Sequence, residues 1–254
     1  MFKAVRIYIL LLVLAAVALD TWRAKTRSVE WRHTLPVNVY MINGDGSAAT
    51  AEYLRGLTLN DFKPVESFMK EEAARYGHDS RASIEIRLGG LLASQPPAPP
   101  QNGNVLEVIV WSLKMRWWAY RHAETRGAGQ QVKIFLLYFD PALSNRLGHS
   151  TGLQKGMIGL VNVFASRDMA RQNDVVIVHE FLHTLGATDK YDAATNQPYF
   201  PNGYAIPEQV PLLPQRFAEI MAGRTPISDS VADIPGGLSD ALIGEKTATE
   251  INWR

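Results

Sequence analysis

One stretch of the sequence decides which fold and chemistry to expect: His179-Glu180-Phe181-Leu182-His183-Thr184-Leu185-Gly186-Ala187-Thr188-Asp189. Two histidines four residues apart lie on the same face of an α-helix, one turn from each other. Both imidazoles can therefore reach one metal ion, and Glu180 can reach a water molecule bound to that ion. Gly186 offers a stop for the helix, and Asp189 follows at a distance suited to a third ligand. The stretch predicts a zinc site of the hydrolytic kind.

The composition is that of an ordinary globular protein of 254 residues, with 46% apolar and 20% charged residues. A formal net charge of +1 gives no broad positive field, so we expect no nucleic acid partner. The absence of cysteine excludes disulfides, thiolate zinc sites and cysteine nucleophiles. Imidazole and carboxylate groups remain as the strong metal ligands.

Residues 1–19 begin with two basic side chains and continue as an uninterrupted apolar run from Ile7 to Leu19. A run of this length after a basic start is typical of a signal peptide and short for a membrane span. The small residues Ala16-Val17-Ala18 suit a cleavage site, although the run could also stay as a short anchor. We expect an exported protein, on the periplasmic or extracellular face, with residues 20–34 as a tether.

Hydrophobic patterning in the remaining chain predicts strands and two long helices. Alternating or continuous apolar runs predict four strands, at 36–42, 83–88, 132–139 and 156–164. Helical spacing predicts one helix that starts at a cap on Asn60 or Asp61 and runs to about Tyr76. It predicts a second helix that is capped by Asn173 or Asp174 and carries the motif to Leu185.

Proline and glycine mark the expected loops, at 89–104, at 142–156 and after Asp192, with a short helix between Ala241 and Trp253. The order of elements indicates an α/β (α+β) fold in one catalytic domain, 35–254. Residues 35–186 would form its upper subdomain, and residues 187–254 a loop-rich lower subdomain.

Residues 105–122 allow two structures. Val105 to Val110 could form a strand, yet apolar residues recur at helical spacing through the segment (Val108, Trp111, Met115 and Trp118). Basic residues border its three tryptophans (Lys114, Arg116 and Arg121). One interpretation is a tryptophan-rich core element with basic edges. The other is a surface that rests against a membrane, because Trp, Lys and Arg favour that boundary.

The motif chemistry requires three protein ligands and one open position for water. His179 and His183 supply two ligands as neutral imidazoles. Glu180 is better placed as a general base, which takes a proton during attack on a carbonyl and returns it to the leaving amine. Zinc lowers the pKa of a bound water to about 7. One catalytic Zn²⁺ and a peptide or protein substrate are therefore expected.

The motif resembles that of the metzincin clan of zinc peptidases. Their pattern, His-Glu-x-x-His-x-x-Gly-x-x-His, is matched at His179, Glu180, His183 and Gly186. Asp189 stands at the position of the last histidine. Some short bacterial members of the clan have aspartate there, so the resemblance implies that Asp189 is the third ligand.

The resemblance extends to a methionine that the clan places in a tight turn beneath the zinc. Met221, within Glu219-Ile220-Met221-Ala222-Gly223, resembles it, although it could also be an ordinary core methionine. Astacin-like members have a tyrosine two residues beyond that methionine, where this chain has Gly223.

The clan also implies a metzincin-like twisted mixed sheet and a long active-site helix. Its last strand before that helix is an edge that pairs with extended substrate through main-chain hydrogen bonds. Residues 156–164 would hold this place, with Gly159, Leu160 and Val161 as the substrate-binding residues.

Other assignments stay open. Asp192 could replace Asp189 as third ligand, or a carboxylate could come from Glu208 or Glu219. Two tyrosines could stabilise an oxyanion or simply pack, and one histidine could be a ligand, a substrate contact or a surface residue (Tyr191, Tyr204 and His149). The chain could also be a catalytically inactive zinc-binding protein, or a membrane-surface interaction protein.

Overall fold

The structure, a computed structural model, describes residues 33–78, 83–100, 104–123 and 131–254, together with residues 6, 8, 11, 12, 30 and 31. The predicted signal peptide or anchor at 1–19 and most of the tether at 20–34 lie outside this description. Among the described residues, no helix is both long enough and apolar enough to cross a membrane.

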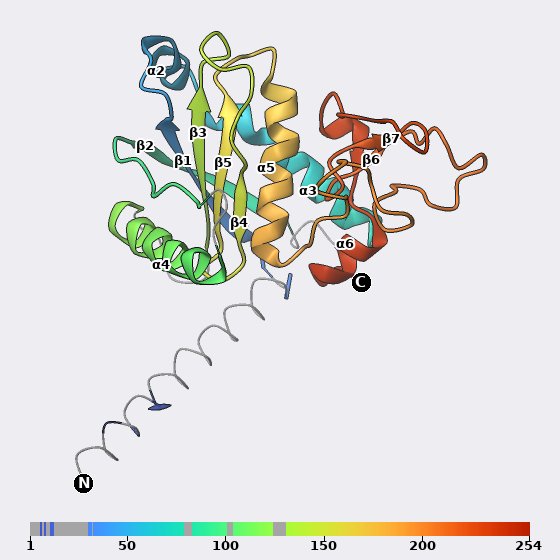
Figure 1. Cartoon of the computed structure of the whole chain (residues 1–254), viewed down its shortest axis with the longest axis horizontal. Coiled ribbons are helices and arrows are strands. Elements are labelled where there is room, and N and C mark those ends of the chain that lie inside the picture. Colours follow the sequence, from blue (N-terminus) through green and yellow to red (C-terminus); the bar gives the residue numbers. More distant parts are fainter. Residues whose placement is uncertain are drawn as a thin grey trace.

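A five-stranded sheet with the order β2-β1-β3-β5-β4 forms the centre of the molecule (Figure 1). Four strands are parallel: β1 (Leu35–Asn43), β2 (Ile84–Leu92), β3 (Val132–Phe139) and β5 (Ile158–Phe164). The short β4 (Thr151–Leu153) runs antiparallel to β5 and ends the sheet. The predicted α+β class with a mixed sheet is confirmed.

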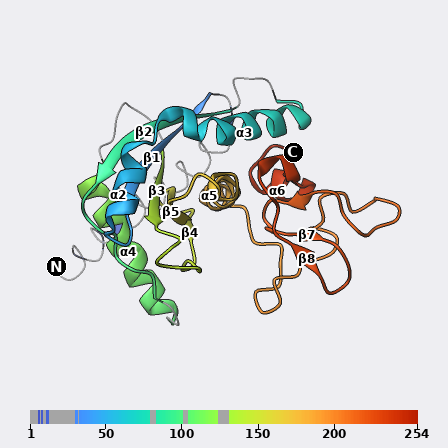
Figure 2. The same ribbon diagram turned by 90° about the horizontal axis from the view of Figure 1, so that it is seen from above.

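Helices cover both faces of the sheet (Figure 2). α3 (Lys63–Arg75) and α5 (Ala170–Leu185) pack on one face, and α4 (Val105–His122) packs on the other. α2 (Ala48–Arg55) contributes Leu54 to the α3–α5 side. The smaller elements are two 3₁₀ turns (Leu59–Phe62 and Leu238–Asp240), β6 (Ala218–Glu219), β7 (Thr225–Pro226), β8 (Ala232–Asp233), β9 (Ala241–Leu242) and α6 (Glu245–Glu250).

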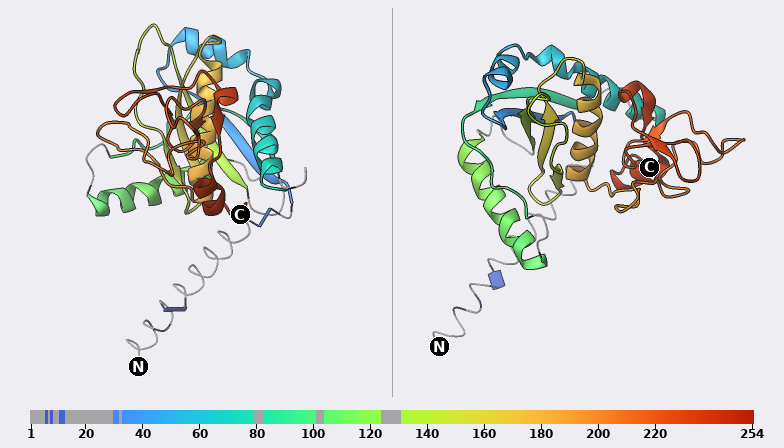
Figure 3. Two further views of the ribbon diagram at one scale, coloured as in Figure 1. Left: turned by 90° about the vertical axis from the view of Figure 1, so that its right-hand side faces the viewer. Right: turned by 45° about the horizontal axis from the view of Figure 1, so that its top comes forward.

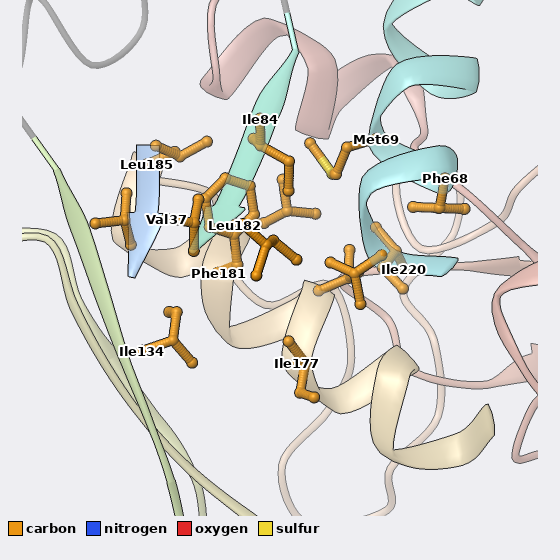
Figure 4. Close-up of a cluster of buried hydrophobic side chains, with 14 of the residues drawn as sticks. Val37, Phe68, Met69, Ile84, Ile134, Ile177, Phe181, Leu182, Leu185 and Ile220 are labelled. Atoms are coloured by element: carbon orange, nitrogen blue, oxygen red, sulfur yellow. The ribbon is translucent and has the colours of Figure 1, made fainter. Parts of the chain in front are cut away.

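The main hydrophobic core lies between the sheet and α5 and continues into the C-terminal part. Figure 4 shows apolar side chains from three sheet strands, from α3 and α5, and from the chain after α5: Val37, Ile84, Ile134, Phe68, Met69, Ile177, Phe181, Leu182, Leu185 and Ile220. α5 buries apolar side chains on two sides, because the sheet packs on one side and the C-terminal part on the other (Figure 3). One cluster thus joins 35–186 to 187–254.

The predicted strands are confirmed, and several boundaries move. β2 continues to Leu92, so the loop predicted to begin at residue 89 starts later. The loop predicted at 142–156 contains β4, and the loop after Asp192 contains the short strands β6 to β8. The C-terminal helix is only Glu245–Glu250. β4 and β6 to β8 were not predicted because a strand of two or three residues is too short to show a hydrophobic period.

Both predicted helix caps are wrong. α3 starts at Lys63, after a 3₁₀ turn that Thr58 and Asp61 close as a capping box. α5 starts at Ala170, and its N-cap is Met169, whose side chain donates or accepts no capping bond. The buried Asn173 instead uses its side chain to bridge to β5, where it accepts from Phe164 N (3.1 Å) and donates to Phe164 O (2.9 Å). The side-chain amide that the sequence pattern assigned to a helix cap is therefore used in a tertiary contact.

The ambiguous segment 105–122 is a helix. Trp111 and Trp118 are buried against the sheet, as the core interpretation predicts, but Trp117 is 62% exposed. The core interpretation therefore accounts for only one side of α4.

Asp174, one turn into α5, gives the stability of the fold a pH dependence. Burial and the nearby Asp61 carboxylate raise its pKa to about 7. The raised value means that the folded state holds a proton that the unfolded chain releases near pH 4, so stability falls as pH rises from about 4 to 7. Asp174→Asn should remove this loss, on the order of 2–4 kcal/mol by pH 7.

Denaturant unfolding of wild type and Asp174→Asn at pH 4 and pH 8 measures the effect. The variant should gain on the wild type as pH rises. A constant difference between the two proteins across this range would contradict the assignment.

Candidate metal centre

Three side chains converge at the C-terminal end of α5. His179 Nε2 and His183 Nε2 lie 3.1 Å apart, because a spacing of four residues stacks them on one helix face. Asp189 Oδ1 lies 3.1 Å from each of these nitrogens. Within the described chain this is the one group of histidine and acidic side chains placed to hold a metal ion.

Gly186 brings Asp189 back to the helix that it has just left. Its φ of +107° ends α5 in the left-handed conformation, and its N–H donates to the carbonyls of Leu182 and His183. A Cβ there would also lie 2.1 Å from Gln154 Nε2. The backbone angle favours glycine here, and a Cβ would also displace the end of the Gln154 side chain; the predicted helix stop is confirmed.

Main-chain carbonyls orient both imidazoles. His179 Nδ1 lies 3.0 Å from Ile220 O, and His183 Nδ1 lies 2.8 Å from Ala187 O. A carbonyl can only accept, so each Nδ1 carries a hydrogen, and in the neutral ring the lone pair is at Nε2. Two nitrogen lone pairs and one carboxylate oxygen then face each other, an arrangement that attracts only through a proton or a cation.

The spacing suits a small divalent ion. Zinc bound to nitrogen and oxygen at about 2.0–2.1 Å in a tetrahedron separates its ligand atoms by about 3.3 Å, close to the 3.1 Å found here. Two imidazoles and a carboxylate are ligands that zinc accepts, and they leave a fourth position open. The residues therefore fit one zinc ion.

The carboxylate of Asp189 is ionised in this setting. Burial alone would raise its pKa, but the two adjacent imidazoles of His179 and His183 outweigh burial and hold the pKa below its usual range. The side chain is 46% exposed, whereas the two histidines are 14% and 18% exposed. The open side of the group is thus at Asp189.

The structure places the rival carboxylates elsewhere. Asp192 accepts hydrogen bonds from the main chain of Ala194 and from Thr195 in its own turn. Glu219 is fully buried among donors of the C-terminal part. Glu208 lines a separate cavity that also contains Tyr204. None of the three belongs to the histidine group.

The loop that carries Asp189 is held by α6, through residues that sequence analysis missed. Glu250 accepts from Thr188 N, from Thr188 Oγ1 and from Lys190 Nζ, at 2.7–2.9 Å. Lys190 is almost fully buried, and its N–H donates to Met221 O at 3.0 Å. Both neighbours of Asp189 are therefore fixed, which positions the ligand between them.

Glu180 lies on α5 between the two histidines in sequence and is only 6% exposed. Burial raises the pKa of its carboxyl, while the two histidines and a hydrogen bond from the Gly152 N–H act in the opposite direction. Its Oε2 is buried and has no hydrogen-bond partner. An orphaned carboxylate oxygen beside the ligand group is what a proton acceptor requires.

The edge strand beside the site is β4, not the strand predicted. Gly159, Leu160 and Val161 belong to β5, which lies between β3 and β4 and is internal. β4 passes directly over the motif, because a Cβ on Gly152 would lie 2.4 Å from His183 Cβ. The prediction took β5, the last strand before α5, as the edge strand. In the structure β4 and β5 form a hairpin, and β4, which precedes β5 in the sequence, lies at the edge.

Met221 lies in a tight turn that touches the site through its backbone. The turn closes with hydrogen bonds from Ala222 N and Gly223 N to Glu219 O, and Gly223 has a φ of +67°. Met221 is fully buried. The carbonyl before it orients His179, as described above, so the turn supports the ligand group.

Of the remaining candidates, only Tyr191 lies beside the ligands. Its ring centre is 6.5 Å from that of His179, and burial together with Asp189 and Glu180 raises its pKa, so its hydroxyl keeps its proton. Tyr204 packs its ring against Phe200, 5.3 Å away. His149 is exposed and stands outside the ligand group.

A cavity of about 380 Å³ opens next to His179 and Tyr191. Its walls come from the loop before β4, from β5, from the exposed side of α5 and from the turn after Met221. Six of the lining residues have large apolar side chains: Leu147, Phe164, Met169, Val175, Val176 and Ile234. The cavity suits an apolar side chain held close to the ligand group.

No protein-family model matches this sequence, and a search of curated proteins found no similar sequence. The resemblance to metzincins therefore rests on the motif residues and on Met221.

Asp189→Ala should lower zinc affinity by at least about 100-fold, because it removes one of three ligands. Zinc titration with a competing chelator measures this change. Asp192→Ala is the matched control, since Asp192 lies outside the histidine group and bonds to Ala194, Thr195 and Tyr199, and it should leave affinity unchanged. Equal affinity of Asp189→Ala and wild type would remove Asp189 from the ligand set.

Glu250→Gln should weaken zinc binding by about 10- to 100-fold, the usual effect of losing a group that orients a ligand. The variant keeps the size of the side chain but loses the charge that pairs with Lys190. Glu245→Gln, in the same helix and paired only with Arg254 among the ion pairs of the described residues, is the control. Wild-type affinity in a folded Glu250→Gln protein would show that α6 does not position Asp189.

Proposed function

We propose that this chain is a zinc-dependent metallopeptidase of the metzincin type, which holds one zinc ion on His179, His183 and Asp189. The observation that supports it best is the carboxylate of Glu180. It is buried, one of its oxygens has no hydrogen-bond partner, and it is near enough to His179, His183 and Asp189 for their charges to act on its pKa. A purely structural zinc site has no use for such a group.

The zinc ion would supply Lewis-acid polarisation of a substrate carbonyl and lower the pKa of a water to about 7. Glu180 takes the proton of that water as it attacks the carbonyl. Burial raises the pKa of Glu180, which favours its protonated form, and the acid would then return the proton to the leaving amine. His179 and His183 stay fixed by their carbonyl partners throughout.

Substrate would lie along β4. This strand ends the sheet in the described part of the chain, so an extended peptide can add to it through main-chain hydrogen bonds. Gly152, within β4, keeps that peptide close to the motif. The apolar cavity beside His179 would accept one substrate side chain, and the Tyr191 hydroxyl would donate to the developing oxyanion.

We further propose that the protein acts after export. The basic start and the apolar run at 1–19 support this proposal, and the absence of cysteine is compatible with an oxidising compartment.

Glu180→Gln should reduce cleavage of a broad peptide library by about 10²- to 10⁴-fold, because the amide cannot take the proton. Zinc content should stay at the wild-type level, since Glu180 is not a ligand. Glu245→Gln serves as the control for a surface carboxylate. Equal cleavage by wild type and Glu180→Gln would rule out Glu180 as the base, and zinc binding without any cleavage by wild type would favour a non-enzymatic zinc protein.

A further inference from the structure

α4 has two apolar sides, and the sheet covers only one of them. Its inner side packs on β1, β3 and β5 through Trp111, Met115, Trp118 and Ala119, all nearly or fully buried. A separate hydrophobic cluster lies on this face of the sheet, and within the described chain these four are its only helical residues. A helix covered on one side is expected to be polar on the other.

The outer side of α4 is apolar as well. Five large side chains recur there at spacings of three and four residues, which places them on one stripe opposite the buried side: Leu106, Ile109, Leu113, Trp117 and Tyr120. They are 68%, 49%, 56%, 62% and 75% exposed. Such a continuous exposed apolar stripe marks a surface that binds something apolar.

The stripe is rich in aromatic groups and bordered by positive charge. The rings of Trp117 and Tyr120 stack with centres 6.1 Å apart, and the Arg121 guanidinium lies 5.8 Å from the Trp117 ring centre. Lys114 and Arg121 are exposed, and Arg116 is half-buried. Glu107 is the only acidic residue of α4. Exposed Trp and Tyr with Lys and Arg are the composition of a helix at a membrane interface.

The chain upstream of β1 reaches the same end of the sheet. Val37, near the start of β1, pairs with Val132 at the start of β3. The next residue of β3, Lys133, donates from Nζ to the carbonyl of Ala123, which follows α4. Trp31 is buried and donates from Nε1 to Ile251 O (2.6 Å), so the 11 residues between Leu19 and Trp31 set the reach, which is at most about 40 Å in extended chain. A membrane segment at 7–19 would therefore hold α4 within reach of the bilayer.

We propose that the outer stripe of α4 rests on a bilayer that carries anionic lipid, with its apolar side chains at the acyl boundary and Lys114 and Arg121 among the headgroups. A second copy of this chain is the less suitable occupant, because two α4 stripes in contact would bring their basic borders together. α4 and α5 lie on opposite faces of the sheet (Figure 2), so this contact leaves the metal centre facing away from the membrane.

The absence of cysteine allows a direct test on the full chain. Leu113→Cys carries an environment-sensitive fluorophore, with a second probe at Tyr120→Cys and a control at Val210→Cys, which is 93% exposed in the C-terminal part. The probes are compared on phosphatidylcholine vesicles with and without roughly one third phosphatidylserine. The α4 probes should shift to the blue and be quenched by brominated lipid on the anionic vesicles, and the Val210 probe should not change.

Charge removal gives the second arm. Lys114→Gln with Arg121→Gln should lower the ratio of inserted to solvent-facing α4 probe about 25-fold, at about fivefold per charge. Sedimentation establishes that the chain is on the vesicles, and circular dichroism that each variant is folded. Unchanged α4 probes on bound chain, an equal shift at Val210, or no binding at all would overturn the proposal. A shift without vesicles that grows with protein concentration would overturn it in favour of self-association.

Discussion

Two hydrogen bonds to main-chain carbonyls set the geometry on which the metal centre depends. The carbonyl of Ile220 fixes the ring of His179, and the carbonyl of Ala187 fixes the ring of His183. Neither carbonyl belongs to α5. The motif helix therefore provides the two imidazoles, but the chain that follows it decides where their lone pairs point. The C-terminal part thus sets the geometry of the ligand group, although it supplies only one ligand.

Buried carboxylates fix the C-terminal part in this position. Glu219 is fully buried and accepts from Met221 N and Ala222 N within the turn, and from Gly244 N and Thr247 Oγ1 near α6. Burial raises its pKa, while the hydrogen bonds from Thr247, Gly244 and Met221 and the charge of Lys190 act against that effect. Glu72 of α3 accepts from Ile243 N in the same way. The turn under His179 is thus tied to both α3 and α6, because an unsatisfied carboxylate at these depths would cost several kcal/mol.

Sequence predicted the parts of the molecule that depend on local spacing. The two histidines on one helix face, the glycine stop and the four long strands follow from periods of 3.6 and 2 and from a positive φ. The contacts that complete the site are long-range: Ile220 is 41 residues from His179, and Glu250 is 60 residues from Lys190. No period links such pairs. The edge strand β4 has three residues, one of them glycine, and the hairpin that carries it outside β5 leaves no pattern in the sequence. Asn173 was misassigned for the same reason, since a cap and a tertiary bridge use the same amide.

Because main-chain groups orient the two imidazoles, the ligand geometry fixes few side-chain identities outside the motif. Any residue supplies a carbonyl, so the orientation of both imidazoles places no demand on side-chain identity at Ile220 or Ala187. The strand that passes over the motif requires glycine at position 152, because any Cβ there would lie 2.4 Å from His183 Cβ and 2.6 Å from Glu180 O. The proposed chemistry therefore depends on few side chains, namely two histidines, a glutamate, a glycine and an aspartate, together with a backbone that orients them.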